Sequence, residues 1–229
     1  MSEMLPPTAT PIEAGLPWER PSSGLGSMLP TIGQFVTSPL AAFSKMSLTV
    51  DLVRPIAYYV VLVLVGAAIA QLWNAIFFEQ TIRMLRQLLP PEFAERFAPL
   101  LQRPSVVQIV LTLIITPLLM LVLLFIWTAL VHAGLVILGG AGGGFAATLR
   151  VVCYARTSDL AAVVPLAGGL VGFVWRRILE AIGLCTAHKC DPWKGAVAVI
   201  LPMVVCCACI AVGAFAFGAA IASALKQMG

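Results

Sequence analysis

The sequence is poor in charge. Only 10% of its 229 residues are Asp, Glu, Lys or Arg, while 60% are hydrophobic and the mean hydropathy is +1.00. Soluble domains carry about 25% charged residues. A soluble globular domain is therefore excluded, and an all-α polytopic transmembrane helical bundle is predicted. The net charge of +4 comes without a basic run, which argues against nucleic acid and favours anionic lipid headgroups as partners.

Groups that support catalysis are equally scarce. The chain has two histidines, His132 and His188, and neither G-x-S-x-G nor H-E-x-x-H occurs in it. We cannot assemble a Ser/His or Asp/His set within the apolar segments, as an intramembrane hydrolase would require. The sequence therefore predicts a protein that is not an enzyme and that needs no cofactor.

The stretch "GLCTAHKC", residues 183–190, is the best local candidate for a metal site. Its Cys185, His188 and Cys190 supply three ligands, whereas a structural zinc site usually has four in a recognised spacing. On a helix Cys185 and His188 share a face and Cys190 does not. We therefore expect no metal, and interpret the stretch as the end of a helix at a membrane surface.

The first 55 residues precede any long apolar run. Residues 1–27 are rich in proline and lack the apolar segment of a signal peptide, so we expect a disordered N-terminal arm. Residues 28–55 have apolar side chains at roughly helical spacing, which predicts amphipathic segments lying on the membrane.

Residues 56–229 form the predicted transmembrane domain. Apolar runs predict four spans, over 56–78, 106–138, 160–183 and 196–225. Residues 79–104 are amphipathic and predict a helical hairpin at the headgroups, and 145–158 can form a further short helix. Lysine and arginine counts on the two sides are equal, so the orientation stays open.

Three charged residues interrupt the third run. Arg176 and Arg177 lie four and three residues before Glu180, so one carboxylate can neutralise one guanidinium on a helix face. Either they lie at the headgroups beneath an interfacial Trp175, or they lie inside the bilayer, where charges are costly and mark function. In the second case they would hold an anionic lipid headgroup or a partner helix.

Small residues recur at the spacing that lets helices pack closely. Gly168 and Gly172 form G-x-x-x-G in the third run, and Gly218 and Ala222 repeat this spacing in the last. We expect helix–helix contacts at both places.

Several motifs resemble, in order, the Yip (Ypt-interacting protein) domain family in its bacterial form. They are "PWE" at 17–19, "SPLAAFSKM" at 38–46, "DLVRPIAYY" at 51–59, "LGGAGGGFAATLRVVCYA" at 138–155, "VPLAGGLVGFVWRRILEAIGLCTAH" at 164–188 and "KGAVAVILP" at 194–202. The positions that carry the resemblance are Pro39, Phe43, Asp51, Pro55, Tyr154, Pro165, His188 and Pro202.

The resemblance implies an integral membrane domain of about five helical segments. Eukaryotic members sit in early secretory membranes and bind prenylated Rab GTPases, whereas bacterial members have no such partner. We therefore expect a non-enzymatic scaffold or adaptor in the bacterial cytoplasmic (inner) membrane, with other membrane proteins or a second copy as partners. A transporter or channel, or a subunit of one, is the first alternative, and an anionic-lipid-binding membrane protein is the second.

Overall fold

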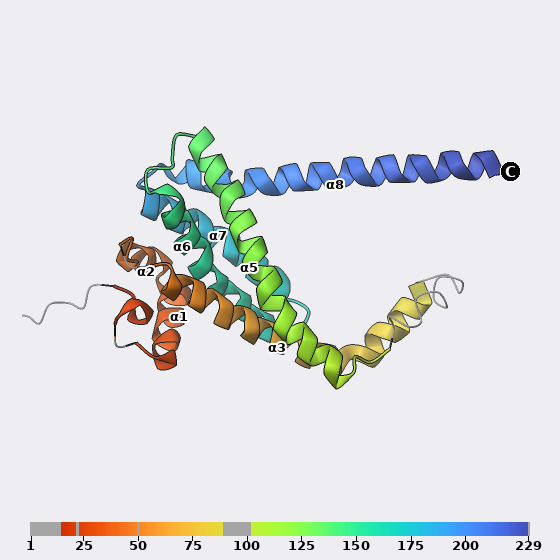
Figure 1. Ribbon diagram of the computed structural model, residues 1–229, viewed down its shortest axis with the longest axis horizontal. Helices are drawn as coiled ribbons and strands as arrows, with labels where there is room; N and C mark the ends of the chain where they lie inside the picture. Colours follow the sequence, from red (N-terminus) through yellow and green to blue (C-terminus); the bar gives the residue numbers. More distant parts are fainter. Residues whose placement is uncertain (1–14, 22, 50, 89–101, 229) are drawn as a thin grey trace, which may run out of the picture.

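The computed structural model describes residues 15–21, 23–49, 51–88 and 102–228. These residues form helices and, within the described ranges, no strand, which confirms the all-α fold class. In chain order the elements are η1 (Pro17–Glu19), η2 (Leu25–Ser27), α1 (Met28–Thr37), α2 (Pro39–Lys45), α3 (Val53–Leu88), α5 (Val106–Ile137), α6 (Gly144–Ala155), η4 (Arg156–Val163), α7 (Gly168–His188) and α8 (Pro192–Met228) (Figure 1).

Three helices of the described chain are long and apolar enough to cross a membrane. They are Val53–Leu85 within α3, Val106–Ile137, and Pro192–Gly218 within α8. Few of their residues are buried within the protein, so their apolar faces are left for lipid. The apolar character of α3, α5 and α8 follows directly from the runs seen in the sequence, and so does the length of α5.

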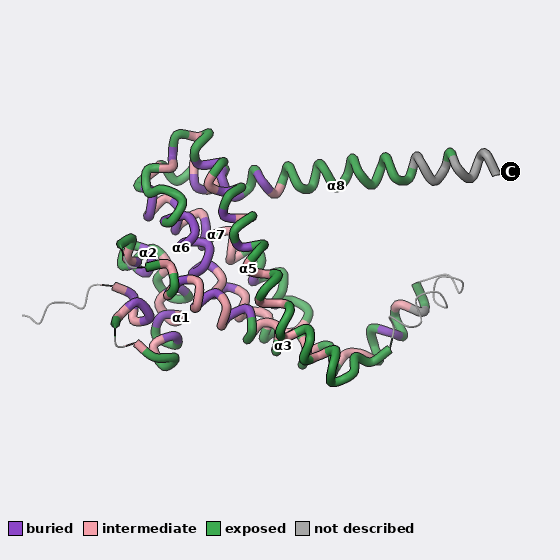
Figure 2. The backbone as a smooth tube through the Cα atoms, in the orientation of Figure 1, coloured by how far each residue is buried: buried purple, intermediate pink, exposed green. Residues whose placement is uncertain are grey.

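The core lies around α6 and α7, which α3 and α5 flank (Figures 1 and 2). Every residue of α6 from Ala147 to Ala155 is buried. A helix that is buried all round needs small or well-paired side chains. Here Arg150 is the one charged residue in that run, and it donates to the backbone oxygen of Ser47 at 2.9 Å.

The predicted disordered arm is wrong for residues 15–21 and 23–27, while residues 1–14 and 22 lie outside the described chain. Leu16 and Trp18 are buried in the core. The Trp18 indole N–H donates to the backbone oxygen of Arg54 at 2.7 Å, and its backbone N–H donates to the Thr31 hydroxyl at 3.0 Å. A proline-rich composition indicated disorder, but a single large aromatic side chain anchors this segment to the start of α3.

Glu19, next to Trp18, joins three parts of the chain. Its carboxylate accepts the backbone N–H of Ser47 and the Tyr154 hydroxyl, each at 2.9 Å. Burial raises the pKa of the Glu19 carboxyl, although both hydrogen bonds oppose that shift. The motif "PWE" therefore closes the N-terminal segment over α6.

Helices α1 and α2 pack their inner faces on the same core. Phe35 stacks on Tyr154 with ring centroids 5.3 Å apart and meets Phe43 edge-on at 4.9 Å. Their outer faces expose Leu29 and Leu40. These helices are therefore apolar on both sides, one side packed on the protein and the other uncovered.

The first predicted span is shorter than the helix that contains it. Helix α3 continues without a break from Val53 to Leu88, so residues 79–88 extend it and do not start a separate hairpin. The rest of the predicted hairpin falls mostly on 89–101, outside the described residues. The reason is local, because no glycine or proline interrupts the chain between Phe78 and Leu88.

The third predicted span, 160–183, is also wrong in its boundaries. Its first part belongs to the 3₁₀ helix η4, which ends at Val163, and α7 begins only at Gly168. Pro165 disfavours a helical residue before it, and Leu166 takes a left-handed backbone conformation with φ of 65°. The charges in the middle of α7 also separate it from the three long apolar helices.

Helix α8 extends away from the body of the protein toward its C-terminal end (Figure 1). Pro202 is buried, whereas residues 204–218 are all exposed. Gly218 has nothing within 4 Å of the position that a β-carbon would occupy, so its predicted close helix contact is not made among the described residues. Ala222 lies in the same helix, beyond the part whose side chains are described.

Candidate functional site: an arginine cluster beside a cavity

Five charged side chains from η4 and α7 form one continuous cluster. Arg156 and Asp159 pair within η4 at 2.7 Å, and Arg176 of α7 lies 3.8 Å from Asp159. Glu180 then pairs with Arg176 at 3.4 Å and with Arg177 at 2.8 Å. Three guanidinium groups face two carboxylates, so the cluster as a whole carries one excess positive charge.

The glycines of α7 bring η4 close enough for this cluster to form. A β-carbon on Gly172 would lie 2.8 Å from the backbone oxygen of Ser158, and one on Gly168 would clash with that of Ala161. Because backbone atoms cannot yield as a flexible side chain does, only glycine fits at these two positions. The G-x-x-x-G pair therefore packs against η4 and sets Asp159 opposite Arg176.

Glu180 is the inner end of the cluster. Its side chain has no exposed surface, and its second oxygen accepts the indole N–H of Trp127 at 3.3 Å. The Arg177 guanidinium lies over the Trp127 ring at 4.5 Å, and that of Arg156 lies over Tyr59 at 5.1 Å. Cation–π contacts of this kind hold a guanidinium in place while leaving its N–H groups free to bind elsewhere.

A cavity of about 400 Å³ opens beside the three arginines. Its polar wall comes from η4 and α7, and its other wall comes from small residues in the middle of α3 together with one residue of α5. The lining residues are Val63, Gly66, Ala67, Ala70, Thr116, Arg156, Asp159, Ala162, Gly168, Gly169, Gly172, Phe173, Arg176 and Arg177. Small side chains on α3 leave the space that the arginines face.

The structure brings together most of the predicted site. Arg176, Arg177 and Glu180 are in direct contact, and Gly168 and Gly172 line the same cavity. Trp175 lies elsewhere, because it lines a shallow apolar depression with Leu170, Val171, Val174 and Ile178. The tryptophan that does contact the cluster is Trp127 of α5.

Sequence reasoning missed four members of the site: Tyr59, Trp127, Arg156 and Asp159. Arg156 and Asp159 have the i,i+3 spacing of an ion pair, which is a local signal that could have flagged them. Nothing in the sequence indicated that this pair would meet Arg176, because the contact depends on the turn at 164–167. Tyr59 and Trp127 carry no local signal that separates them from aromatic residues at a membrane interface or in a core.

The family-motif positions have structural partners. Pro39 starts α2, Pro55 lies in the first turn of α3, and the Asp51 carboxylate accepts the Val53 backbone N–H at 3.1 Å just before that helix. The ring of His188 accepts the Gly143 backbone N–H at 2.9 Å and meets the Thr148 hydroxyl at 2.9 Å.

Metal-ligating groups are dispersed in the part of the chain that the structure describes. There, no three or more His, Cys, Asp or Glu side chains gather as a metal site, and the six cysteines are all free thiols. In "GLCTAHKC", both ring nitrogens of His188 already have protein partners. His188 therefore tethers the end of α7 to the glycine-rich turn before α6 through its hydrogen bond with the Gly143 backbone N–H.

The apolar helices together with the lipid-facing surface define an integral membrane protein of helical type. The sequence model of the Yip1 domain matches residues 33–214, which is most of the chain, and the protein belongs to the Yip1 domain family. No curated protein and no solved structure matches it.

Proposed function

We propose that this protein binds the phosphate of an anionic membrane lipid in the arginine cavity, as a membrane component without enzymatic activity. The observation that carries the proposal is the cavity itself, where three guanidinium groups and one carboxylate line about 400 Å³ of space and the second carboxylate lies behind them. Guanidinium groups present paired donors that match phosphate oxygens, and charge-assisted bonds of this kind are the strong ones.

The depth of the cavity supports a lipid ligand. Gly66 lies thirteen residues after the start of α3, and Thr116 lies ten residues after the start of α5. At about 1.5 Å per residue these are about 20 and 15 Å along helices long enough to cross a hydrocarbon core about 30 Å thick, so we infer that the cavity lies within the bilayer. Excess positive charge at that depth is costly unless it has a use, and a lipid phosphate neutralises it.

Glu180 and Asp159 fit this function as positioning groups. Glu180 holds Arg176 and Arg177 from the side opposite the cavity, because it is buried and is not among the lining residues. Asp159 lines the cavity itself and holds Arg156 at 2.7 Å, with Arg176 3.8 Å away. Prearranged guanidinium groups lose less conformational entropy when the ligand binds.

A scaffold or adaptor role is the second candidate, and α8 favours it. Residues 204–218 form an apolar helix whose side chains are all exposed, and Gly218 offers a small face to a neighbour. A second copy or another membrane protein would pack there, in the bacterial cytoplasmic membrane that the resemblance to bacterial members implies. The transporter alternative has a cavity in its favour but needs an opening on both sides of the bilayer.

Lipid retention in native mass spectrometry tests the primary function. The protein is purified in mild detergent with phosphatidylglycerol or phosphatidylcholine at equal concentration. We expect the wild type to retain phosphatidylglycerol, and Arg177→Gln to bind it about 10- to 100-fold more weakly, because one charge-assisted contact contributes about 1.5–3 kcal/mol. Arg83→Gln, which removes an exposed arginine of α3, is the matched control and should bind as the wild type does.

A variant that fills the cavity tests lipid binding without removing any of the three arginines. A β-carbon on Gly66 would meet nothing within 4 Å, so Gly66→Leu can place its side chain in the cavity without displacing backbone. We expect it to lose phosphatidylglycerol while keeping the melting temperature of the wild type. If both Gly66→Leu and Arg177→Gln retain the lipid as the wild type does, the proposed function is wrong.

A further inference from the structure

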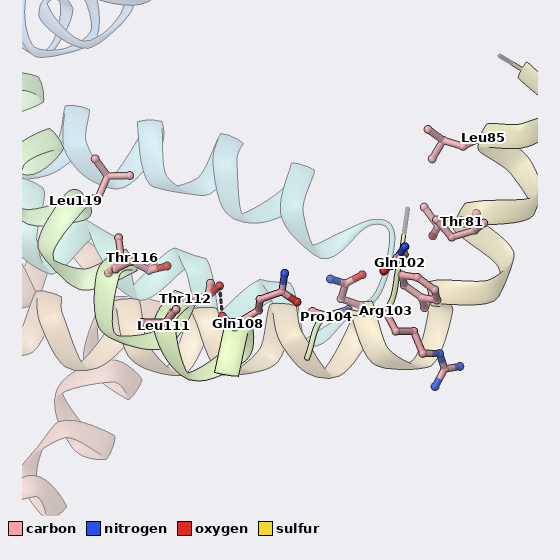
Figure 3. Close-up of a pocket in the computed structure, with 14 residues that line it drawn as sticks. Thr81, Leu85, Gln102, Arg103, Pro104, Gln108, Leu111, Thr112, Thr116 and Leu119 are labelled. Carbon is pink, nitrogen blue, oxygen red and sulfur yellow. Dashed lines mark hydrogen bonds between the residues drawn. The ribbon is translucent and has the colours of Figure 1, made fainter. Parts of the chain in front are cut away.

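A second and larger hollow, of about 710 Å³, lies between the C-terminal half of α3 and the N-terminal half of α5 (Figure 3). Half of its lining is polar, which is unusual for a surface between two helices that can cross a membrane. The polar members are Asn74, Thr81, Gln102, Arg103, Gln108, Thr112 and Thr116.

Three of these polar residues follow one face of α5. Gln108, Thr112 and Thr116 are spaced by four residues, so they lie one above another along the helix. The Thr112 hydroxyl donates to the Gln108 backbone oxygen at 2.8 Å, which leaves its oxygen able to accept another hydrogen bond (Figure 3). Between Val110 and Met120, every residue of α5 other than Thr112, Thr116 and Pro117 has an aliphatic or Met side chain. The polar side chains of this stretch are therefore confined to the face that lines the hollow.

Thr116 connects this hollow to the arginine cavity, because it lines both. At the other end lies Arg103, whose guanidinium is exposed and lies 3.3 Å from Glu79. The stripe from Gln108 to Thr116 covers about 12 Å at 1.5 Å per residue. A polar surface therefore leads from the beginning of α5 to the arginines.

The edges of the hollow identify the kind of ligand that could use it. Leu85, Leu111, Ile115 and Leu119 line it beside the polar stripe. A free phosphate ion has no use for such an apolar border, whereas a phospholipid has a polar headgroup and apolar chains on one molecule. The mixed lining fits a lipid whose headgroup follows the threonines while its acyl chains stay in the bilayer.

We propose that the hollow between α3 and α5 is a lateral entry groove through which an anionic phospholipid moves its headgroup from the membrane surface near Arg103 to the arginine cavity. The inference rests on the proposed function, since the cavity is where the groove leads. The groove sets the rate at which lipid enters and leaves, and the arginines set how much is bound.

Lipid exchange separates these two contributions. Protein loaded with phosphatidylglycerol in detergent micelles is mixed with a large excess of chain-deuterated phosphatidylglycerol, and the bound mass is followed by time-resolved native mass spectrometry. The variant Thr112→Val replaces the hydroxyl by a methyl group of similar size at a position that lines the groove and not the arginine cavity. We expect it to exchange about tenfold more slowly than the wild type while retaining the same amount of lipid at equilibrium.

The variant Thr112→Ser keeps the hydroxyl and should exchange at a rate near that of the wild type. If the valine variant exchanges lipid as fast as the wild type, the proposed entry groove is wrong. This holds even when Arg177→Gln has lost its lipid, as the proposed function requires. The groove proposal would also be overturned if inorganic phosphate displaced the bound lipid at the same rate from the wild type and from the valine variant. A free anion would then reach the arginine cavity by a route other than the groove.

Discussion

Replacing Glu180 by alanine should lower the stability of this protein by about 3–5 kcal/mol, because it leaves two mostly buried guanidinium groups without their shared carboxylate. Glu180 is buried, pairs with Arg176 at 3.4 Å and Arg177 at 2.8 Å, and accepts the Trp127 indole N–H. No other carboxylate of the cluster can take over, since Asp159 lies 3.8 Å from Arg176 and pairs mainly with Arg156.

Thermal unfolding in detergent measures the effect, and we expect the melting temperature to fall by roughly 10 °C. Glu79→Ala is the matched control. Glu79 also pairs with an arginine, Arg103, but both side chains are more than half exposed, so its loss should cost about 0–1 kcal/mol. Equal melting temperatures for the two variants would show that Glu180 does not hold the cluster together.

Trp18→Ala should be comparably damaging, by about 3–5 kcal/mol, the usual cost of truncating a buried large aromatic residue. The Trp18 ring packs 6.1 Å from Tyr58 between ring centroids, and its indole N–H donates to the Arg54 backbone oxygen at 2.7 Å. The Arg54 guanidinium in turn donates to the backbone oxygens of Trp18, Pro21 and Ser23. Truncating Trp18 therefore loosens the hold of residues 15–27 on α3.

Limited proteolysis and thermal unfolding together test this second effect. In Trp18→Ala we expect cleavage within residues 15–27 under conditions in which the wild type is resistant there, along with a lower melting temperature. Trp193→Ala is the control, because Trp193 is 56% exposed and its truncation removes little packing. A Trp18→Ala protein as stable and as resistant as the Trp193→Ala protein would mean that this segment is not part of the core.

The sequence predicted best what depends on local pattern. The apolar runs located α5 to within a residue or two, since a bilayer-length stretch of hydrophobic side chains has few alternatives to a helix. The spacing of Arg176, Arg177 and Glu180 also predicted their ion pairs, because side chains three and four residues apart are neighbours on any helix.

The sequence failed where a few tertiary contacts outweigh composition. Residues 15–27 look disordered by their proline content, yet Trp18 and Glu19 gain enough buried contact to order them. The apolar run beginning at Leu160 looks like the start of a span, yet Pro165 and Leu166 turn the chain before α7 begins. That same turn places Asp159 against Arg176, so half of the site was invisible to local reasoning.

A structure of the protein in nanodiscs that contain phosphatidylglycerol tests the central claim most directly. We predict density for a lipid phosphate in the cavity between α3, η4 and α7, with its oxygens about 2.7–2.9 Å from guanidinium nitrogens of the arginine cluster, Arg177 among them. A cavity that holds only an acyl chain or water, with the arginines turned toward protein groups alone, would contradict the account.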